Sequence, residues 1–448
     1  MNPIVQDIIN QFHIDKPKME LIIEKMLTEM ENGLQDKPST LQMLPTYSPI
    51  PTGKEKGTFM GIDVGGTNLR VLLLDIPEPG MRGELKSVEC VMPKTSTTID
   101  QFFGFIAEKM KEFIVSQHLT ETEIKAGLTF SFACEQIAID KGIQVTWTKG
   151  WNIPDSIGKD IVSIFHSQLE KIGVTNIKIV AFINDTVGTF ANLAYEDRSC
   201  GIGIIFGTGT NGCYIERTEH FAQSKLKSKY DNEYMVVNTE WGGLYFPELG
   251  FNRFDEMIND ISINKDKQRY EKLISGIYMG WQTRLAMREL MEKNVVFGRY
   301  KDSLVFSDSP DDTQFDDKRK FSSRHTEIVE DTSAELSRVN AILKGLGVED
   351  STLEERQVLR AVCEAVVKRA GYLSAAVTVA CYRKMVPYMK ERTTAGIDGT
   401  VYEKSVPFKR FFLEALEILQ PQEKVYCQLS KDGSGLGAVI LAAAVSCK

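Results

Sequence analysis

Residues 59–74 carry the sequence FMGIDVGGTNLRVLLL. Two apolar runs, 59–64 and 69–75, flank the turn residues 65–68, so the pattern predicts two neighbouring strands joined by a tight turn. The paired glycines allow positive φ and a close backbone approach, so that successive N–H groups of the turn can point at an anion. An ordinary β-hairpin with a glycine turn is the alternative, and the glycines alone do not separate the two.

Three side chains beside this turn favour an anion site. Thr67 adds a hydroxyl and Arg70 adds a planar fork that matches phosphate oxygens. Asp63 immediately precedes the turn, where a carboxylate can hold a hydrated Mg²⁺ next to phosphates.

A second stretch of the same kind is FGTGTNG, residues 206–212, between apolar runs at 202–206 and 213–216. It contains a formal Gly-x-Gly-x-x-Gly, but a dinucleotide fold needs a helix after the glycines and this sequence continues as a strand. A second hairpin turn that faces the first is favoured, and it would bind the other end of a nucleoside triphosphate. The recurrence predicts two related α/β lobes, and no Walker lysine loop occurs.

Polar residues also follow apolar strands. Asn184 and Asp185 follow 180–183, Thr148 and Lys149 follow Trp147, and Glu240 lies in NTEWGG. A carboxylate at a strand end can point into a cleft and serve as a general base. A helix cap or a solvated turn is the alternative for each of them, and for Asp185 taken alone the cap is favoured.

The rest of the chain alternates helical and strand-like patterns. Helices are expected over 1–36, 101–117, 155–172 and 353–390, and strands over 128–132 and 177–183. Residues 45–56 are predicted to be a connector, 218–233 a surface excursion and 307–320 a charged surface loop.

Composition excludes several classes of protein. The 448 residues are 42% hydrophobic and 25% charged, as in ordinary globular domains, and a net charge of −8 argues against general nucleic-acid or membrane-surface binding. The eight cysteines form no C-x-x-C pair and there are five histidines, so a structural zinc site is not expected. The N-terminus lacks a signal-peptide core and the longest apolar stretch, 436–445, is too short to span a bilayer. A cytoplasmic protein with reduced thiols is predicted.

Nine stretches together resemble the eukaryotic hexokinase and glucokinase family over nearly the whole chain. They are MLPTYSPIPTGKEKGTFMGIDVGGTNLRVLLL (43–74), LTFSFACEQIAIDKGIQVTWTKGW (128–151), INDTVGTF (183–190), FGTGTNGCY (206–214), NTEWGGL (238–244), RYEKLISGIYMG (269–280), VCEAVVKRAGYLSAA (362–376), GIDGTVYEKSVPFKRFF (396–412) and KDGSGLGAVILAAA (431–444). So many motifs in one order make the resemblance specific, and the length corresponds to a single catalytic unit.

The resemblance implies a fold and its division into domains. The fold is α/β, a two-lobed actin-like ATPase (ribonuclease H-like) fold in which each lobe is a mixed sheet flanked by helices, with a cleft between. The small domain is expected to comprise 58–186 plus 434–448, and the large domain 1–57 plus 187–433. The lobes are expected to hinge near 57–58, 185–187 and 433–435 and to close on a sugar.

The resemblance also implies an ATP-dependent hexokinase that uses Mg²⁺. It would transfer the γ-phosphoryl group to the 6-hydroxyl of glucose, and of hexoses such as mannose or fructose, in the first step of glycolysis. Asp185 matches the catalytic base and Arg70 the residue that neutralises phosphate charge. Positions that match sugar-binding residues are Ser131, Thr148, Lys149, Asn184, Asp185, Asn211, Glu240, Gln268 and Glu271. Positions that match nucleotide-binding residues are Asp63 (to Mg²⁺ through water), Gly65, Gly66, Thr67, Asn68, Arg70, Gly207, Thr208, Gly209, Gly399 and Thr400.

Some positions depart from the family pattern. Ala133 stands where most relatives have proline, Trp281 replaces a glutamate, and Leu436 replaces a basic or small residue. Ile277 and Glu327 stand where some relatives have Lys and Ser near the nucleotide.

Two other classes of function share parts of the pattern. A catalytically silent sugar sensor on the same fold is one alternative, against which the joint presence of Asp185, Thr67 and Arg70 argues. A polymerising or chaperone-type actin-like ATPase shares the two phosphate turns but would not need the polar sugar set. Glucose or another hexose and Mg-ATP are therefore the expected partners, nucleic acid is not, and a homodimer is compatible with the sequence.

Overall fold

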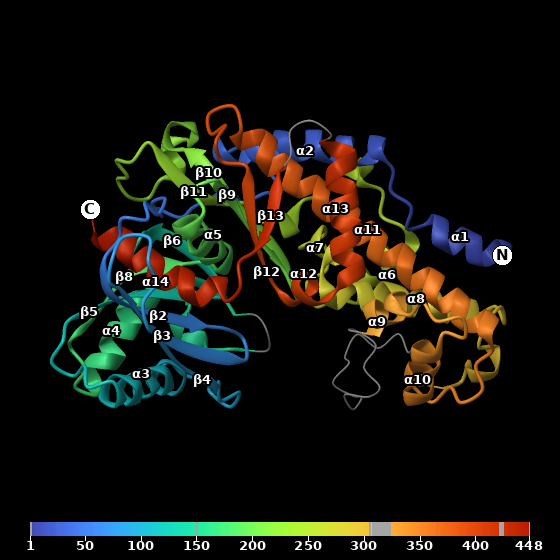
Figure 1. The fold of residues 1–448 in the computed structure, drawn as a ribbon, viewed down its shortest axis with the longest axis horizontal. Coiled ribbons are helices and arrows are strands. Elements are labelled where there is room, and N and C mark those ends of the chain that lie inside the picture. The colour runs from blue at the N-terminus through green and yellow to red at the C-terminus, as the bar shows by residue number, and fades with distance from the viewer. Residues whose placement is uncertain (1, 148–150, 304–305, 307–323, 421–424, 448) are drawn as a thin grey trace.

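A computed structural model describes residues 2–147, 151–303, 306, 324–420 and 425–447. Two mixed sheets form the centres of two lobes, and the chain ends lie at opposite ends of the long axis (Figure 1). The predicted charged loop at 307–320 lies outside the described residues.

The smaller sheet has the order β4-β3-β2-β5-β8. Its strands are β2 (Gly57–Val64), β3 (Asn68–Ile76), β4 (Leu85–Val91), β5 (Ile124–Phe130) and β8 (Ile177–Ile183). The hairpin β2–β3 and the edge strand β4 are antiparallel, whereas β2, β5 and β8 are parallel. Leu69 and Val71 of β3 belong to the core that also holds Phe102 and Phe103, while Leu72 and Leu74 join the main core of the molecule on the other face. This alternation is the period of two that a strand buried on both faces requires.

The larger sheet has the order β1-β11-β10-β9-β12-β13. Its strands are β1 (Leu44–Pro45), β9 (Cys200–Phe206), β10 (Thr210–Arg217), β11 (Tyr234–Asn238), β12 (Thr394–Asp398) and β13 (Tyr426–Leu429). Here too an antiparallel hairpin, β9–β10, lies beside a parallel strand, β12. Both predicted strand–turn–strand units are therefore confirmed as hairpins at equivalent places in two mixed sheets.

Helices cover the faces of both sheets (Figure 1). They are α1 (Pro3–Asn10), α2 (Lys16–Leu34), α3 (Ile99–Ser116), α4 (Ile161–Lys171), α5 (Asp185–Glu196), α6 (Arg253–Ile261), α7 (Glu271–Ile274), α8 (Gly276–Glu292), α9 (Arg324–Glu330), α10 (Ser337–Gly345), α11 (Leu353–Met385), α12 (Thr400–Lys404), α13 (Val406–Leu419) and α14 (Gly433–Ser446). Within the described ranges, no helix combines the length and the apolar composition that crossing a bilayer requires.

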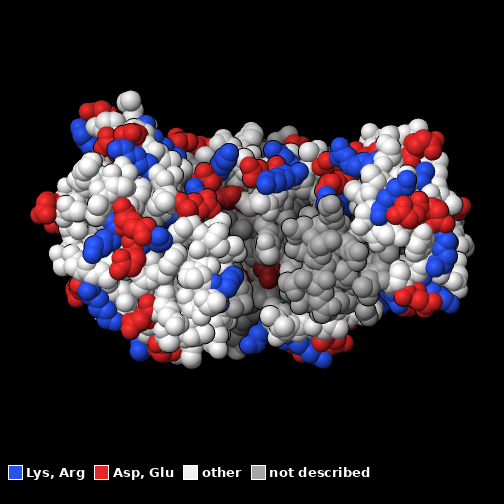
Figure 2. Space-filling model, turned by 90° about the horizontal axis from the view of Figure 1, so that it is seen from below, with Lys and Arg blue, Asp and Glu red and all other residues white. Residues whose placement is uncertain are grey.

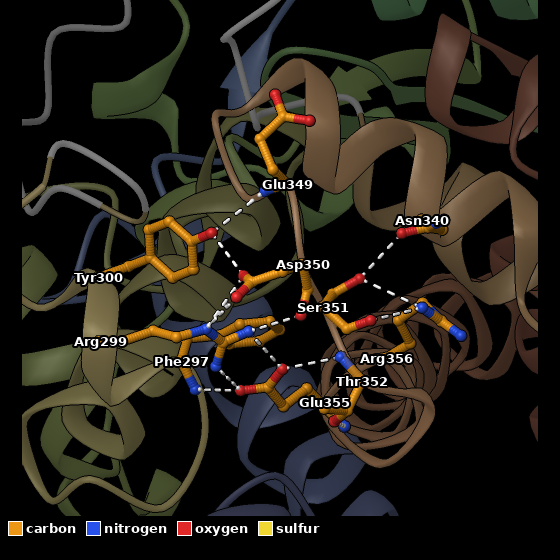
Figure 3. Close-up of polar contacts among 10 residues, drawn as sticks. All are labelled: Phe297, Arg299, Tyr300, Asn340, Glu349, Asp350, Ser351, Thr352, Glu355 and Arg356. Atoms are coloured by element: carbon orange, nitrogen blue, oxygen red, sulfur yellow. Dashed lines mark hydrogen bonds and ion pairs between the residues drawn. The ribbon is translucent and has the colours of Figure 1, made fainter.

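The long helix α11 begins at a dense polar network (Figure 3). Thr352 and Glu355 form a capping box, in which each side chain accepts the backbone N–H of the other. The guanidinium of Arg299 bridges Asp350, at 3.0 Å, and Glu355, at 2.6 Å. This network ties the segment after α8 to the start of α11, the helix whose middle is buried in the large lobe.

Several predicted boundaries are wrong. The helix expected over 1–36 is two helices, α1 and α2, because Asp15 caps the second by accepting the N–H of Lys18, and the helix expected over 353–390 ends at Met385. The helix expected over 155–172 begins only at Ile161, because the Asp160 side chain accepts the N–H of Val162 as its N-cap and 154–156 form a separate 3-10 turn. The strand expected over 128–132 runs from Ile124 to Phe130, so Ser131 lies just beyond the end of β5.

Helix α14 packs between the two lobes with backbone-to-backbone contacts. A Cβ added at Gly437 would lie 2.0 Å from the carbonyl oxygen of Gly188 in α5, and one at Gly127 of β5 would lie 2.0 Å from that of Ala438. Only glycine permits approaches this close. The predicted assignment of 434–448 to the small domain, and the other domain boundaries, stay predictions.

Gly437→Ala is expected to lower the free energy of unfolding by about 3 kcal/mol, because the new methyl group must push α14 away from α5. Gly104→Ala in α3 is the matched control, since its Cβ would make only an ordinary contact, 3.6 Å from Gln168. That control is expected to be stabilised by up to about 1 kcal/mol through helix propensity. Urea unfolding of both variants measures the difference, and equal stability would disprove the close contact.

Candidate functional site

The first glycine turn joins β2 and β3. It is closed by the N–H of Gly65, which donates to the carbonyl oxygen of Asn68 at 3.0 Å. Asp63 and Arg70 are directly paired across the hairpin, so their side chains project from the same face of the sheet beside the turn. A carboxylate and a guanidinium thus flank one glycine-rich backbone segment.

The start of α14 contacts both of these side chains. The guanidinium of Arg70 forms a 3.2 Å ion pair with Asp432, which has a left-handed backbone with φ of 56°. The hydroxyl of Ser434 donates to Asp63 at 2.6 Å, and the Ser434 carbonyl accepts from Thr129 at 2.8 Å. The segment 432–434 therefore joins the site at the first glycine turn.

The second glycine turn, between β9 and β10, is built against two other segments. The N–H of Gly276, at the start of α8, donates to the carbonyl oxygen of Gly207 at 2.9 Å. Gly399 has φ of 107°, and a Cβ there would lie 2.4 Å from the carbonyl oxygen of Phe206. Thr208 and Thr400 are both exposed beside this junction. The second turn and the Gly399–Thr400 turn are therefore adjacent.

An amide–carboxylate cluster lies at the end of β11. The Nδ2 group of Asn211 donates to Glu240 at 3.0 Å and to the Oδ1 atom of Asn238 at 2.9 Å. Asn238 in turn donates to the same Glu240 oxygen at 2.7 Å. Glu240 has a left-handed backbone with φ of 52°, which turns its side chain back towards β10.

Glu271 connects this region with the second glycine turn. Its Oε2 atom accepts the N–H of Thr210 at 3.0 Å. Gln268 also has a left-handed backbone, with φ of 51°, and a Cβ added at Gly242 would lie 2.4 Å from its Oε1 atom. The loop that carries both residues is held by buried Lys272, whose Nζ donates to Asn259 and to the carbonyl oxygen of Asn264, each at 3.0 Å.

Asp185 is the first residue of α5. The preceding Asn184 caps the helix by accepting the N–H of Thr186 at 3.0 Å, and Asp185 Oδ1 accepts the same N–H at 2.9 Å. Burial raises the pKa of Glu240, and the charge of Asp185 adds to this rise. Burial likewise raises the pKa of Asp398, with Asp432 and Asp185 adding to it. The charge of Asp185 therefore lies near carboxylates of both the amide cluster and the Gly399 turn.

Several predicted residues lie together and others do not. Printed contacts and shared electrostatics link the second glycine turn, Asp185 and the amide cluster, and Arg70 and Asp63 link the first turn to 432–434. Figure 2 shows a hollow near the middle of the molecule in which acidic atoms are visible. The N–H of Ser131 donates to the carbonyl oxygen of Val64, next to the first turn. The Asn68 side chain instead donates to Glu89 of β4. Thr148 and Lys149 lie outside the described residues.

Three polar residues of this region receive no role from the sequence, Asn238, Asp398 and Asp432, and Ser434 receives only a place in the expected hinge. Each lies within a motif that the sequence singles out, one to three positions from a residue that received a role or a place in the hinge. In the sequence, only their closeness to predicted site residues could have pointed to them. Each forms a hydrogen bond or an ion pair with a segment that is distant in the sequence, so no local pattern predicts these contacts.

Glu240→Gln is expected to raise the free energy of unfolding at pH 7 by about 1 kcal/mol, since it removes a carboxylate whose ionisation burial disfavours. Because the folded pKa is raised above the ordinary value of 4.5, the gain is present above the folded pKa and disappears as the pH falls to 4.5. Urea unfolding at both pH values tests this. Exposed Glu121→Gln is the control and should show no difference, and a loss of stability in Glu240→Gln at pH 7 would contradict the prediction.

Two family models described as hexokinase match residues 4–195 and 201–444. The chain belongs to the hexokinase family. Mouse "Hexokinase HKDC1" is 34% identical over 98% of this chain but only 47% of its own length, so this hexokinase-family chain spans about half the length of the first curated relatives it matches. Rice "Hexokinase-3" is 34% identical over 95% of this chain and 87% of its own length.

Solved structures confirm the fold of this hexokinase-family chain. The hexokinase of Schistosoma mansoni complexed with glucose matches with a TM-score of 0.82 and 32% identity, over 98% of both chains. A second hexokinase crystal structure, 24% identical, matches the fold with a TM-score of 0.81. The predicted two-lobed actin-like ATPase fold, with mixed sheets flanked by helices, is therefore confirmed.

The positions that depart from the family pattern differ in their surroundings, and Ala133 is exposed at the start of β6 (Ala133–Ala138). Trp281 is buried, and its ring meets the Tyr278 ring edge-on with the ring centres 5.4 Å apart. Leu436 is buried in the core. Ile277 directly follows the glycine that bonds Gly207, so an apolar side chain stands next to the second turn. Glu327 forms a 2.8 Å ion pair with Arg324. At positions 277 and 327 this chain therefore differs in charge from the family members with Lys and Ser.

The residues beside the first glycine turn would fit a magnesium ion bound together with a nucleotide. Asp63 supplies one carboxylate, of which one oxygen accepts from Ser434, beside a turn suited to phosphates. Among the described residues, no group of three or more His, Cys, Asp or Glu side chains is arranged to hold a metal ion. Mg²⁺ typically binds through one or two carboxylates, waters and substrate phosphates, and Asp63 suits this mode.

Proposed function

We propose that this chain is an ATP-dependent hexokinase that transfers the γ-phosphoryl group of ATP to the 6-hydroxyl of glucose, with mannose and fructose as further acceptors. The observation that carries this proposal is the position of Asp185 at the start of α5, near enough to both Glu240 of the amide–carboxylate cluster and Asp398 before the Gly399 turn for its charge to help raise the pKa of each. A base between a polar pocket and a nucleotide turn suits phosphoryl transfer to an alcohol. The glucose complex of the Schistosoma relative supports a hexose as the acceptor.

The polar set suits a hexose because a sugar presents a donor and an acceptor at each hydroxyl. Amides supply both, and carboxylates accept, so Asn184, Asn211, Glu240, Gln268 and Glu271 can satisfy a ring of hydroxyls together with Ser131, Thr148 and Lys149. Such a pocket discriminates strongly against sugars that lack one hydroxyl, because its polar groups then stay unpaired.

In this proposal Asp185 accepts the proton of the 6-hydroxyl as that oxygen attacks the γ-phosphorus. Phosphoryl transfer asks the protein mainly for positioning and for stabilisation of charge on the phosphate oxygens. Arg70 and the backbone N–H groups of residues 65–67 would bind those oxygens, and residues 207–209, 399 and 400 would hold the rest of the nucleotide. Bound Mg²⁺, held through water by Asp63, would supply further charge neutralisation.

Closure of the two lobes would protect the reaction from water. Water competes with the sugar as phosphoryl acceptor, and closure around the sugar excludes it. The first glycine turn joins two strands of the smaller sheet, whereas Glu240 accepts from Asn211 of the larger sheet, so the two lobes contribute different parts of the site. The Arg70–Asp432 pair joins the first turn to the start of α14.

A coupled assay with purified full chain, Mg²⁺ and a panel of donors and hexoses tests the proposal. Phosphorylation of glucose by ATP, and none of 6-deoxyglucose, is the expected result. A chain that binds glucose in calorimetry but phosphorylates no hexose with any nucleoside triphosphate would overturn the kinase and identify a sugar sensor.

A further inference from the structure

The carbonyl oxygen of Gly66, in the first glycine turn, accepts two side-chain donors. The ammonium of Lys94 donates to it at 2.6 Å, and the indole N–H of Trp151 donates to it at 2.8 Å. The two donors come from segments far apart in the sequence, one just after β4 and the other after β7 (Lys141–Thr146).

The two donors are held against each other. The Lys94 ammonium lies 4.6 Å from the centre of the Trp151 ring, within cation–π range. Trp151 is only 5% exposed, and its ring meets Phe102 of α3 edge-on at 4.9 Å. A buried, packed indole is a rigid donor, so the oxygen of Gly66 is held in one direction.

The direction of this carbonyl determines the direction of the next N–H. In a planar trans peptide the C=O and the N–H of the following residue point in opposite directions. This peptide unit joins Gly66 to Thr67, and Gly66 has no Cβ to restrict its rotation on that side. Fixing the Gly66 oxygen on one side therefore fixes the Thr67 N–H on the other.

The segment that carries Lys94 forms one more hydrogen bond to the first glycine turn. The N–H of Met92, two residues before Lys94, donates to the carbonyl oxygen of Thr67 at 2.8 Å. Both carbonyls that follow Gly65 in the turn are thus occupied by donors from neighbouring segments. A turn whose carbonyls are occupied by its own scaffold presents its N–H groups to an anion without reorganisation.

We propose that Lys94 and Trp151 are positioning residues that orient the Gly66–Thr67 peptide for binding the nucleotide phosphates. This inference rests on the proposed function, because it assigns the nucleotide to the same turn. It predicts that loss of the donors weakens nucleotide binding while glucose binding and folding persist.

Trp151→Phe keeps the packed ring and removes the N–H, and Lys94→Met keeps the stem and removes the charged donor. Each single variant is expected to raise the Kd of a non-hydrolysable Mg-ATP analogue about fivefold, as the loss of one hydrogen bond implies. The double variant is expected to exceed the product of the two, above about 25-fold, because either donor alone still holds the shared oxygen. Lys94→Arg retains a donor and should restore most of the affinity.

Matched controls make the same chemical changes elsewhere. Trp147→Phe removes an indole N–H that donates to Ile153 and Ser156 in the same aromatic cluster, and Lys225→Met removes an ammonium that donates to the carbonyl of Gln42. Neither should change the Kd for the analogue. The chain has four tryptophans, and in ¹⁵N-indole spectra Lys94→Met should shift the resonance that Trp151→Phe deletes.

The outcomes separate this inference from the proposed function. A double variant that binds the analogue within twofold of the unsubstituted chain, or a Trp147→Phe variant that weakens it equally, would overturn the positioning role. An unsubstituted chain that binds the analogue but phosphorylates no hexose would overturn the kinase alone, and one that does not bind the analogue would overturn both.

Discussion

Asp185→Asn is expected to lower kcat for glucose phosphorylation by about 10³-fold, while the Kd for glucose changes by less than about tenfold. An amide has no basic oxygen for the proton of the 6-hydroxyl, so the general base is lost. The fold should persist, because an asparagine oxygen can still accept the Thr186 N–H that Asp185 Oδ1 now accepts at 2.9 Å.

Coupled kinetics and calorimetry with glucose measure these two effects separately. Asp185→Ala should show the same loss of kcat, which excludes an effect of the amide itself. Asp100→Asn is the matched control, since it also substitutes an aspartate in the first turn of a helix, α3, and it should leave kcat unchanged. A variant of Asp185 that retains kcat within tenfold would remove this residue as the base.

Arg70→Ala is expected to lower kcat by about 10²-fold to 10³-fold, because a donor that stabilises charge developing on the phosphates is lost. Its side chain and that of Asp432 are 24% and 46% exposed, so breaking their ion pair should cost no more than about 1 kcal/mol of stability. Arg70→Lys should recover only part of the rate, since an ammonium cannot form the planar fork.

Arg217→Ala provides the control for this prediction. Arg217 forms a 3.0 Å ion pair with Glu219 on the larger lobe, with 36% of its side chain exposed, and its loss should leave kcat unchanged. Stopped-flow or steady-state kinetics at saturating glucose, together with urea unfolding, distinguishes lost catalysis from lost stability. Full activity in Arg70→Ala would exclude this arginine from the transfer step.

Local patterns in the sequence predicted the elements that carry the site. The two hairpins follow from apolar runs of strand length around paired or spaced glycines, which act within a few residues. The start of the helix after residue 155 was not predicted correctly, since Pro154 and Asp160 both offer a helix start and only the bond from Val162 to Asp160 identifies the cap.

The resemblance to the hexokinase family predicted roles for single residues, but it predicted no contacts between them. That Glu271 accepts from Thr210 of the second turn, and that Asn238 binds both Asn211 and Glu240, became visible only in three dimensions. The left-handed backbones of Glu240 and Gln268 could not be predicted from the sequence either, because neither residue type prefers positive φ.

By itself, the sequence determined the hexokinase family, the two glycine hairpins and the residue types available for a sugar and a nucleotide. Only the tertiary structure decided that Arg70 meets Asp432, 362 positions away, and that Gly66 receives the indole of Trp151, 85 positions away. Hairpins form from neighbours in the chain, whereas these pairs depend on the packing of sheets and helices that brings distant segments together. Packing of that kind orients the first turn, and no pattern within the turn itself encodes it.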